Sequence, residues 1–228
     1  MFKTKELFLK FKLYLIVFIT IIFINTLMHQ QFILASSSKS RYKILKNAGL
    51  NFIQKKPNCN EEDIKKTINR KTKPEIFAKK LSYEKARSVS KQKPYANKIV
   101  LGCDTVIYHN GKILDKVNSI EKAQKKIISL SGKTHLIVSG LTICLNGSKI
   151  WENYEKTHVK IRKLNNSEIK IYLKRTGKQI LSSVGCYQIE SLGPNIIESI
   201  KGDYFNVMGL PLFNLLDYLY SKKKKNFT

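Results

Sequence analysis

The chain has 228 residues, of which 43% are hydrophobic and 10% aromatic, which excludes a disordered chain and predicts one folded unit. Its 42 Lys and Arg residues exceed its 16 Asp and Glu residues, so the formal net charge is +26. This charge favours polyanionic partners: nucleic acid, an anionic membrane surface or phosphorylated small molecules. An AT-rich genome, which enriches Lys, Asn and Ile, would produce the same excess without any binding role. Charge alone therefore does not choose the partner.

The cysteines stand singly, with no CxxC pair and no histidine at metal-ligand spacing; they are Cys59, Cys103, Cys144 and Cys186. This spacing argues against a zinc site and against a disulfide framework. Cys103 and Cys144 lie in apolar runs, which predicts small buried side chains rather than nucleophiles. A reducing compartment, the cytoplasm, fits this pattern.

The first 27 residues need a separate interpretation. Lysines precede an apolar stretch over residues 13–24, which resembles a secretory signal but lacks a small-residue cleavage site and is short for a membrane span. Met28 stands directly before the first apolar segment of the domain. We interpret residues 1–27 as a start-site artefact rather than an anchor, 28–221 as the folded domain and 222–228 as a basic tail.

The first predicted elements are a strand, a polar turn and a helix. The apolar run 32–35 ends in three serines, and helical spacing over 40–48 closes at Gly49. A turn at the carboxyl end of a strand that opens a helix can present backbone N–H groups to a phosphate. Further helices are predicted at 61–68 and 74–90.

An acidic residue interrupts the next apolar segment. Residues 99–102 and 105–108 predict a strand, followed by a hairpin turn at Asn110 and Gly111. Asp104 lies between these two apolar runs. A lone Asp in an apolar strand is costly to bury unless it is paired, hydrogen-bonded or bound to a ligand. Asp104 is therefore the best site candidate among the carboxylates.

The second half of the chain continues the alternation of strands and helices. In order, the patterns predict a helix at 119–130 capped by Ser119, strands at 134–145 and 151–161, a helix from a Ser167 cap to 174, and a closing helix at 212–220. The lysine run 222–225 is interpreted as a frayed, solvated tail. The irregular spacing, without GxGxxG or a P-loop, predicts an α/β fold with a mixed sheet.

Several polar residues could together support phosphate chemistry: Ser36, Ser38, Arg41, Glu61, Lys85, Asp104 and Lys116. Triphosphate oxygens need cations and N–H or O–H donors. Carboxylates can hold a hard divalent metal ion, and a further carboxylate can take a proton from an attacking water. Any basic protein offers such sets, so residue types alone leave the assembly open.

Four ordered segments sharpen this hypothesis: LASSSKSR (34–41), LGCDTV (101–106), LSGKTH (130–135) and GDYFNVMGLPL (202–212). They resemble the motifs LASxSPRR, LGADTVV, LSGxTH and GDYxNVVGLPL of the Maf family of nucleoside triphosphate pyrophosphatases, and the likeness extends over residues 31–220. The resemblance implies that Asp104 accepts the proton, that Glu61 and Asp104 hold Mg²⁺ or Mn²⁺, and that phosphate is bound by Ser36, Arg41, Lys85 and Lys116. Asn60 replaces the Asp of the family's DE pair.

The resemblance also implies an elongated, two-lobed α/β fold similar to inosine triphosphate pyrophosphatases, with the nucleotide in a cleft and often a homodimer. The expected activity is hydrolysis of (d)NTPs, modified or noncanonical ones among them, to the monophosphate and pyrophosphate. A cytoplasmic protein with no membrane and no stable nucleic-acid complex is expected, and the family's historical naming suggests a link to cell division arrest.

Three positions bear on which base is preferred. Ser40 replaces the first Arg of the family motif, a position the family uses to distinguish bases. Thr105 agrees with the branch that hydrolyses dTTP and UTP, whereas Glu190 resembles the branch that acts on 7-methyl-GTP. These signals conflict, so the sequence leaves the base open.

The alternatives are structural roles and a different class of function. Asp104 could simply pair with a lysine, and Lys85 and Lys116 could be solvated surface residues. His135 is interpreted as structural, and Asp203 as shaping a loop. A basic nucleic-acid-binding module without catalysis is the competing function, but no zinc-finger or RNA-recognition signature occurs.

Overall fold

The computed structural model describes residues 31–69 and 72–225, so the interpretation of residues 1–27 falls outside the described part. Its main elements are β1 (Phe32–Ala35), α2 (Lys39–Asn47), β2 (Phe52–Lys55), α3 (Glu61–Thr67), α4 (Pro74–Ser90), β3 (Val100–His109), β4 (Lys112–Leu114), α5 (Ile120–Leu130), β5 (Thr134–Leu145), β6 (Ser148–Ile161), α6 (Asn166–Thr176), β7 (Ile197–Lys201), α7 (Tyr204–Val207) and α8 (Leu212–Lys225). Short 3₁₀ turns add η1 (Lys93–Tyr95), η2 (Gly177–Ser182) and η3 (Gly193–Asn195). None of the helices in these ranges is both long and apolar enough to cross a membrane.

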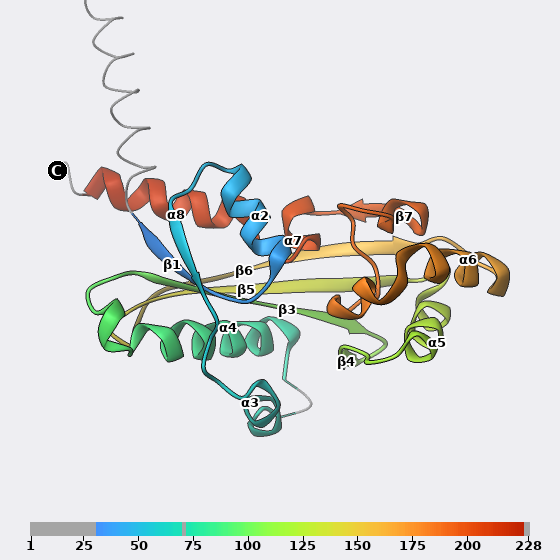
Figure 1. The fold of residues 1–228 in the computed structure, drawn as a ribbon, viewed down its shortest axis with the longest axis horizontal. Coiled ribbons are helices and arrows are strands. Elements are labelled where there is room, and N and C mark those ends of the chain that lie inside the picture. The colour runs from blue at the N-terminus through green and yellow to red at the C-terminus, as the bar shows by residue number, and fades with distance from the viewer. Residues whose placement is uncertain (1–30, 70–71, 226–228) are drawn as a thin grey trace, which may run out of the picture.

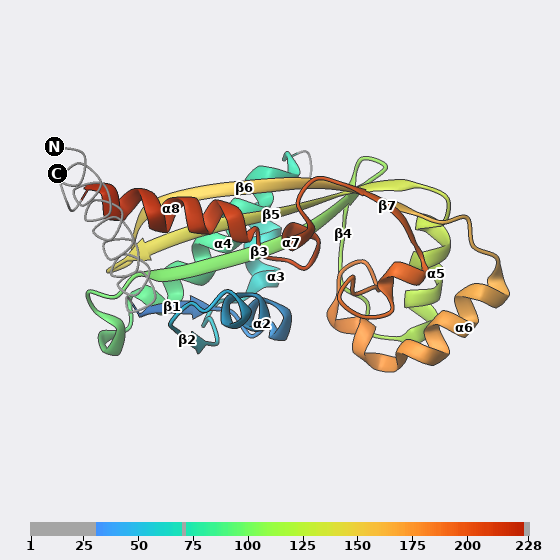
Figure 2. The ribbon, with the colours of Figure 1, turned by 90° about the horizontal axis from the view of Figure 1, so that it is seen from above.

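One mixed seven-stranded sheet organises the molecule, which confirms the predicted α/β class. The strand order is β2-β1-β3-β5-β6-β7, and β4 pairs with β3 off this path. β1 is parallel to both β2 and β3, and the pairs from β3 through β5 and β6 to β7 are antiparallel. The long strands β3, β5 and β6 extend along the elongated molecule (Figures 1 and 2).

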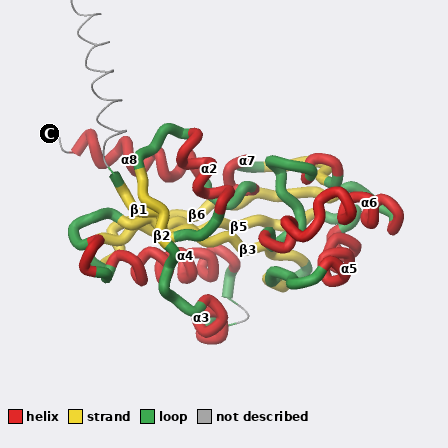
Figure 3. Tube along the Cα trace, in the orientation of Figure 1, coloured by secondary structure: helices red, strands yellow, loops and turns green. Residues whose placement is uncertain are grey.

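Helices cover the two ends of these long strands separately. We call the end with β1, β2, α2, α3, α4 and α8 the α4 lobe, and the end with β4, α5, α6, η2, η3 and β7 the α6 lobe (Figure 3). In the α4 lobe the sheet is covered on both faces, by α4 on one and by α2 and α8 on the other. A separate apolar core in the α6 lobe joins α5 and α6 to the sheet.

The first strand shows why the α4 lobe needs helices on both faces. Phe32 and Leu34 pack into the core beneath α2 and α8, whereas Ile33 and Ala35 face α4. All four side chains are buried, because successive side chains of a strand point to opposite faces and both faces are covered. The continuous apolar run in the sequence therefore corresponds to a strand that helices cover on both faces.

Several boundaries differ from the predicted ones. β3 is one continuous strand from Val100 to His109, so Asp104 lies within it and does not interrupt it. The prediction that Ser167 caps the helix now labelled α6 is wrong: the Asn165 side chain accepts from the Glu168 N–H and the Glu168 side chain accepts from the Asn165 N–H, forming a capping box. The sequence reading also missed β2.

The C-terminal lysine run is helical in its backbone. α8 continues through Lys225, beyond the predicted end at residue 220, so the interpretation of residues 222–225 as a frayed tail is wrong for the backbone. Lysine has good helix propensity, and the helix is already anchored upstream by buried Leu215 and Tyr218. Propagation of an existing helix needs no further apolar contact.

Candidate active site

The carboxyl end of β1 lies beside the middle of β3. Ala35 is paired with Gly102, so Ser36 follows the end of β1 at the level where β3 continues toward Asp104. In open α/β sheets, ligands bind at the carboxyl ends of parallel strands, where loops open a crevice. The predicted polar turn and the predicted acidic residue are brought together here.

A buried lysine joins the two candidate carboxylates. Lys85 Nζ lies 2.5 Å from Asp104 Oδ1 and 2.9 Å from Glu61 Oε1. The side chains of Lys85 and Asp104 are only 7% and 9% exposed, whereas that of Glu61 is 47% exposed. Lys85 is therefore not the solvated residue that the alternative reading described, and Asp104 does pair with a lysine.

The ion pair exists because α4 lies unusually close to the sheet. A Cβ at Gly102 would lie 2.1 Å from the Ser82 carbonyl oxygen, and one at Gly140 would lie 2.5 Å from the Ala78 carbonyl carbon. Gly140 is also the β5 partner of Asp104. Because only glycine permits this approach, these two positions allow α4 to bring Lys85 to Asp104.

The charges of this centre shift the pKa values of its members. Burial lowers the pKa of Lys85, but the charges of Asp104 and Glu61 outweigh that effect and the pKa rises above its usual range. For Glu61 the signs are opposite. Burial raises the pKa of its carboxyl group, but the charge and the hydrogen bond of Lys85 outweigh burial, so the pKa is lowered. Lys85 is thus held as an ammonium between carboxylates.

Arg41 holds the turn to the sheet. Its Nη1 donates to Ser36 Oγ at 3.1 Å, its Nη2 to Thr105 Oγ1 at 3.1 Å and its Nε to the Gly209 carbonyl at 2.8 Å. Ser38 caps α2 by accepting from the Arg41 N–H at 3.3 Å. Three of the five N–H donors of Arg41 are thus engaged within the protein, which leaves two for a ligand.

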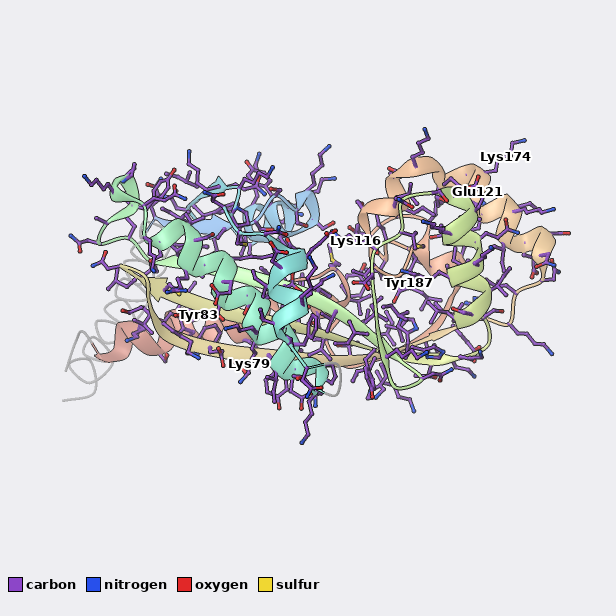
Figure 4. The ribbon with its side chains drawn as sticks, turned by 90° about the horizontal axis from the view of Figure 1, so that it is seen from below. Lys79, Tyr83, Lys116, Glu121, Lys174 and Tyr187 are labelled. Carbon is purple, nitrogen blue, oxygen red and sulfur yellow. The ribbon has the colours of Figure 1, made fainter. Side chains whose placement is uncertain are left out.

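Lys116 approaches the same centre from the other lobe. It follows β4, and Figure 4 shows its side chain extending from that segment toward α3. Although Lys116 is exposed, the surrounding protein partly desolvates its ammonium and lowers its pKa, and the charges of Arg41 and Lys85 lower it further. Among the described residues Lys116 forms no hydrogen bond or ion pair, so its ammonium is available to an anion.

The two lobes meet directly at Ser40 and Glu190. Ser40 Oγ donates to Glu190 Oε1 at 2.7 Å, although the residues are 150 positions apart in sequence. Glu190 is exposed and Ser40 is half-buried. Two of the three predicted specificity positions therefore touch across the lobes, whereas Thr105 lies beneath Arg41 in a hydrogen bond with Ser139 at 2.8 Å.

The donor set suits a magnesium-type ion only in part. No three His, Cys, Asp or Glu side chains converge on a metal position anywhere in residues 31–69 or 72–225 that the structure describes. Glu61 and Asp104 nevertheless flank one cationic position, which Lys85 Nζ occupies. Because Mg²⁺ commonly uses one or two carboxylates plus substrate phosphates and waters, these two residues fit such an ion once a triphosphate supplies oxygens.

Sequence reasoning missed the role of a backbone carbonyl. The Gly209 oxygen accepts from Arg41 Nε, from Thr105 Oγ1 at 3.2 Å and from Cys103 Sγ at 3.2 Å. Gly209 has φ of 101°, in the region that favours glycine, and the GLP motif was the available signal.

Asn60, which stands where the family has an Asp, caps α3: its side chain accepts from the N–H groups of Glu62 and Asp63.

The chain is similar in sequence to known proteins over most of its length. The model of the family described as Maf-like protein matches residues 31–222. A 7-methyl-GTP pyrophosphatase of Bartonella henselae is 41% identical over 184 residues, covering 81% of this chain and 91% of that protein. A nucleoside triphosphate pyrophosphatase of Caulobacter vibrioides is 35% identical over 187 residues, 82% and 92% of the two chains, and one of Pelagibacter ubique is 35% identical over 193 residues, 84% and 98%.

Proposed function

The chain belongs to the Maf family, and from this premise we propose that it hydrolyses nucleoside triphosphates to the monophosphate and pyrophosphate. The observation that carries the proposal is the buried Lys85 between Asp104 and Glu61, beside Arg41 and the first turn of α2. This arrangement offers cations for phosphate and carboxylates for a metal and a proton. The named activity of the relatives points to the same chemistry.

In the proposed reaction, phosphate oxygens are bound by Arg41, Lys116 and the hydroxyl of Ser36. The first turn of α2 adds N–H groups without intrahelical acceptors, which favour an anion at a helix N-terminus. Lys85 places a further positive charge next to the reacting phosphate. Preorganised charges of this kind stabilise the charge that develops during phosphoryl transfer.

Asp104 takes the proton in the proposed mechanism. Its Oδ1 is paired with Lys85, and its Oδ2 has no hydrogen-bond partner among the described residues. Water adds to the α-phosphorus as its proton passes to Asp104, and the bond from the α-phosphorus to the bridging oxygen breaks, which releases pyrophosphate. A divalent ion held by Glu61 and Asp104 would supply neutralisation of triphosphate charge.

The carboxylate of Glu190, which contacts Ser40, favours a nucleotide whose purine base carries N–H donors over a nucleotide with a pyrimidine base. A carboxylate accepts paired N–H donors such as those on the Watson–Crick edge of guanine, and it attracts the positive charge that 7-methylation places on that base. Two relatives at 41% identity are named 7-methyl-GTP pyrophosphatases. We therefore propose 7-methyl-GTP as the first substrate to test, ahead of dTTP and UTP.

The remaining expectations also stay proposals. A Mg²⁺ or Mn²⁺ cofactor, a homodimer and a cytoplasmic location fit a nucleotide-pool enzyme of this family. A stable nucleic-acid complex is not expected, because the sequence carries no zinc-finger or RNA-recognition signature.

The test is a panel of NTPs, including 7-methyl-GTP, with Mg²⁺ or Mn²⁺, in which pyrophosphate and orthophosphate release are measured separately. We expect pyrophosphate release, lowered about 10²- to 10⁴-fold in kcat by Asp104→Asn. Asp217→Asn, the same change at an exposed carboxylate of α8, is the matched control and should retain activity. Orthophosphate as the sole product, or equal turnover by both variants, would contradict the proposal.

A further inference from the structure

A buried histidine–tyrosine pair lies at the start of the segment that carries Glu190, apart from the candidate catalytic groups. His135 Nε2 and Tyr187 Oη are 2.6 Å apart, with ring centroids separated by 5.7 Å. The residues are only 2% and 4% exposed, and Figure 4 shows Tyr187 inside the α6 lobe. The proposed catalytic groups do not include this pair, which is joined by the only side-chain hydrogen bond of either residue among the described residues.

Glu190 stands at the tip of a tight loop that begins at Tyr187. The Gln188 carbonyl accepts from the Ser191 N–H at 3.1 Å and from the Gly193 N–H at 2.9 Å, which closes the loop on itself. A Cβ at Gly193 would lie 2.4 Å from that carbonyl oxygen. A loop closed this tightly moves as a unit, so the position of Glu190 depends on how the base of the loop is anchored.

The base of the loop is wound around the Tyr187 ring. A Cβ at Gly185 would lie 2.5 Å from Tyr187 Cε1, and Cys186 has a φ of 58°, an uncommon conformation for a residue other than glycine. Packing against the ring leaves its hydroxyl as the one polar atom to be satisfied, and His135 satisfies it. A buried hydroxyl without a partner would be costly.

His135 in turn belongs to the rigid part of the sheet. It lies in β5, five positions before the Gly140 that pairs with Asp104 in β3. The hydrogen bond therefore connects the loop of Glu190 to the same strand pair that holds the proton acceptor. Burial, with a smaller effect of His109, lowers the pKa of His135 to about 4, and burial raises that of Tyr187, so both side chains are neutral at assay pH.

We propose that His135 and Tyr187 are positioning residues for base recognition: their hydrogen bond sets where Glu190 meets the nucleotide, without touching it. The proposal rests on the proposed function, in which Glu190 contacts the base. It assigns to the histidine of the LSGKTH segment a role beyond filling the core. It also gives a function to the hydroxyl of Tyr187, whose ring otherwise packs among apolar side chains.

The kinetic test compares Tyr187→Phe with Tyr218→Phe. The second variant is a matched control, because Tyr218 is also buried but its hydroxyl has no hydrogen bond among the described residues. For the best NTP of the panel we expect Tyr187→Phe to raise KM about five- to tenfold, to change kcat less than about threefold, and to weaken discrimination between bases. In a Glu190→Ala background the same change should no longer raise KM, because interacting positions are non-additive.

Hydrogen exchange provides a readout that needs no turnover. The N–H groups of Ser191 and Gly193 should exchange faster in Tyr187→Phe than in the wild type or Tyr218→Phe. Unchanged exchange with unchanged KM, or a KM increase that persists fully without Glu190, would overturn the positioning role. If the wild type hydrolyses no nucleotide, the proposed function fails, whereas the exchange experiment still decides whether the pair anchors the loop.

Discussion

The two lobes contribute polar groups of different character to one site. Lys85 and Arg41, from the α4 lobe, are buried and already held by ion pairs or hydrogen bonds within the protein. Lys116 and Glu190, from the α6 side, are exposed; the first forms no hydrogen bond among the described residues and the second forms one, with Ser40. In the proposed mechanism the catalytic groups are therefore held in place by the fold of one lobe, whereas the other lobe presents adjustable contacts.

This difference between the lobes separates the cost of arranging charges for the reaction from the cost of ordering side chains on binding. Charges that are ordered during folding need no reorganisation when the substrate reacts, which is the basis of electrostatic catalysis. Exposed long side chains must be ordered when the ligand binds, at a cost of about 0.5–1.5 kcal/mol each. Changes in the α4 lobe should consequently affect stability and kcat, and changes in the α6 lobe should affect mainly KM.

Removing the central ammonium should have the largest effect. Lys85→Met keeps the length of the side chain but leaves Asp104 buried without its partner, so we expect a loss of about 3–5 kcal/mol in the free energy of unfolding. Urea denaturation followed by circular dichroism measures it. Lys79→Met is the matched control: Lys79 is on the same helix, in a more exposed ion pair with Glu152, and its replacement should cost no more than about 1 kcal/mol. Equal losses would show that burial of the pair is irrelevant.

Removing the unpaired ammonium should affect binding instead. Lys116→Ala should raise KM for the NTP about tenfold, because one phosphate contact is lost, while the unfolding free energy changes by less than about 0.5 kcal/mol. Steady-state kinetics and urea denaturation on the same preparations test both parts. A large stability loss with unchanged KM would reverse the assignment of Lys116 to the adjustable group.

The lowered pKa of Lys116 adds a pH dependence. Only its protonated form binds phosphate, so kcat/KM should fall as pH rises through this pKa, which lies below the ordinary 10.5. For stability the sign is opposite: the folded state holds this proton less tightly than the unfolded state, so the charge opposes folding at lower pH and the penalty disappears as pH approaches 10.5. Lys116→Arg should move the alkaline fall in kcat/KM to higher pH, because arginine stays charged.

The contact between the lobes should give the smallest effect. Ser40→Ala removes the hydrogen bond to the exposed Glu190, and we expect KM for 7-methyl-GTP to change about two- to threefold with kcat unaffected. Ser37→Ala, in the same turn at an exposed position, is the control. A tenfold loss of kcat in Ser40→Ala would place Ser40 among the chemical groups instead.

Local structure followed closely from the sequence where local interactions decide it. The strand Thr134–Leu145, the helix Pro74–Ser90 and the Asn-Gly hairpin turn at residues 110–111 all have the predicted bounds, because periodicity and turn residues act over short range. The cap at Asn165 was missed in favour of Ser167, since adjacent polar residues offer equivalent caps and only the backbone path selects one. β2 was missed because its side chains are only partly buried and give a weak pattern.

The candidate site was predictable as a set of residues and not as an arrangement. Asp104 stood out because a carboxylate in an apolar strand needs a partner, but nothing in the sequence chose Lys85 from the many lysines without the family motif. The GLP motif marked Gly209 as a special position, but it did not assign a role to the carbonyl, because every residue carries such an oxygen and only the fold directs one to Arg41.

The sequence by itself determined the α/β class and most element bounds. Its four ordered motifs also indicated the family of the chain and the residues of the candidate site. The tertiary structure alone decided that Lys85 bridges Glu61 and Asp104, that Ser40 meets Glu190, and that His135 meets Tyr187. The physical reason is range. Helix and strand patterns arise between residues a few positions apart, whereas these contacts join residues 19 to 150 positions apart and depend on how closely helices pack on the sheet.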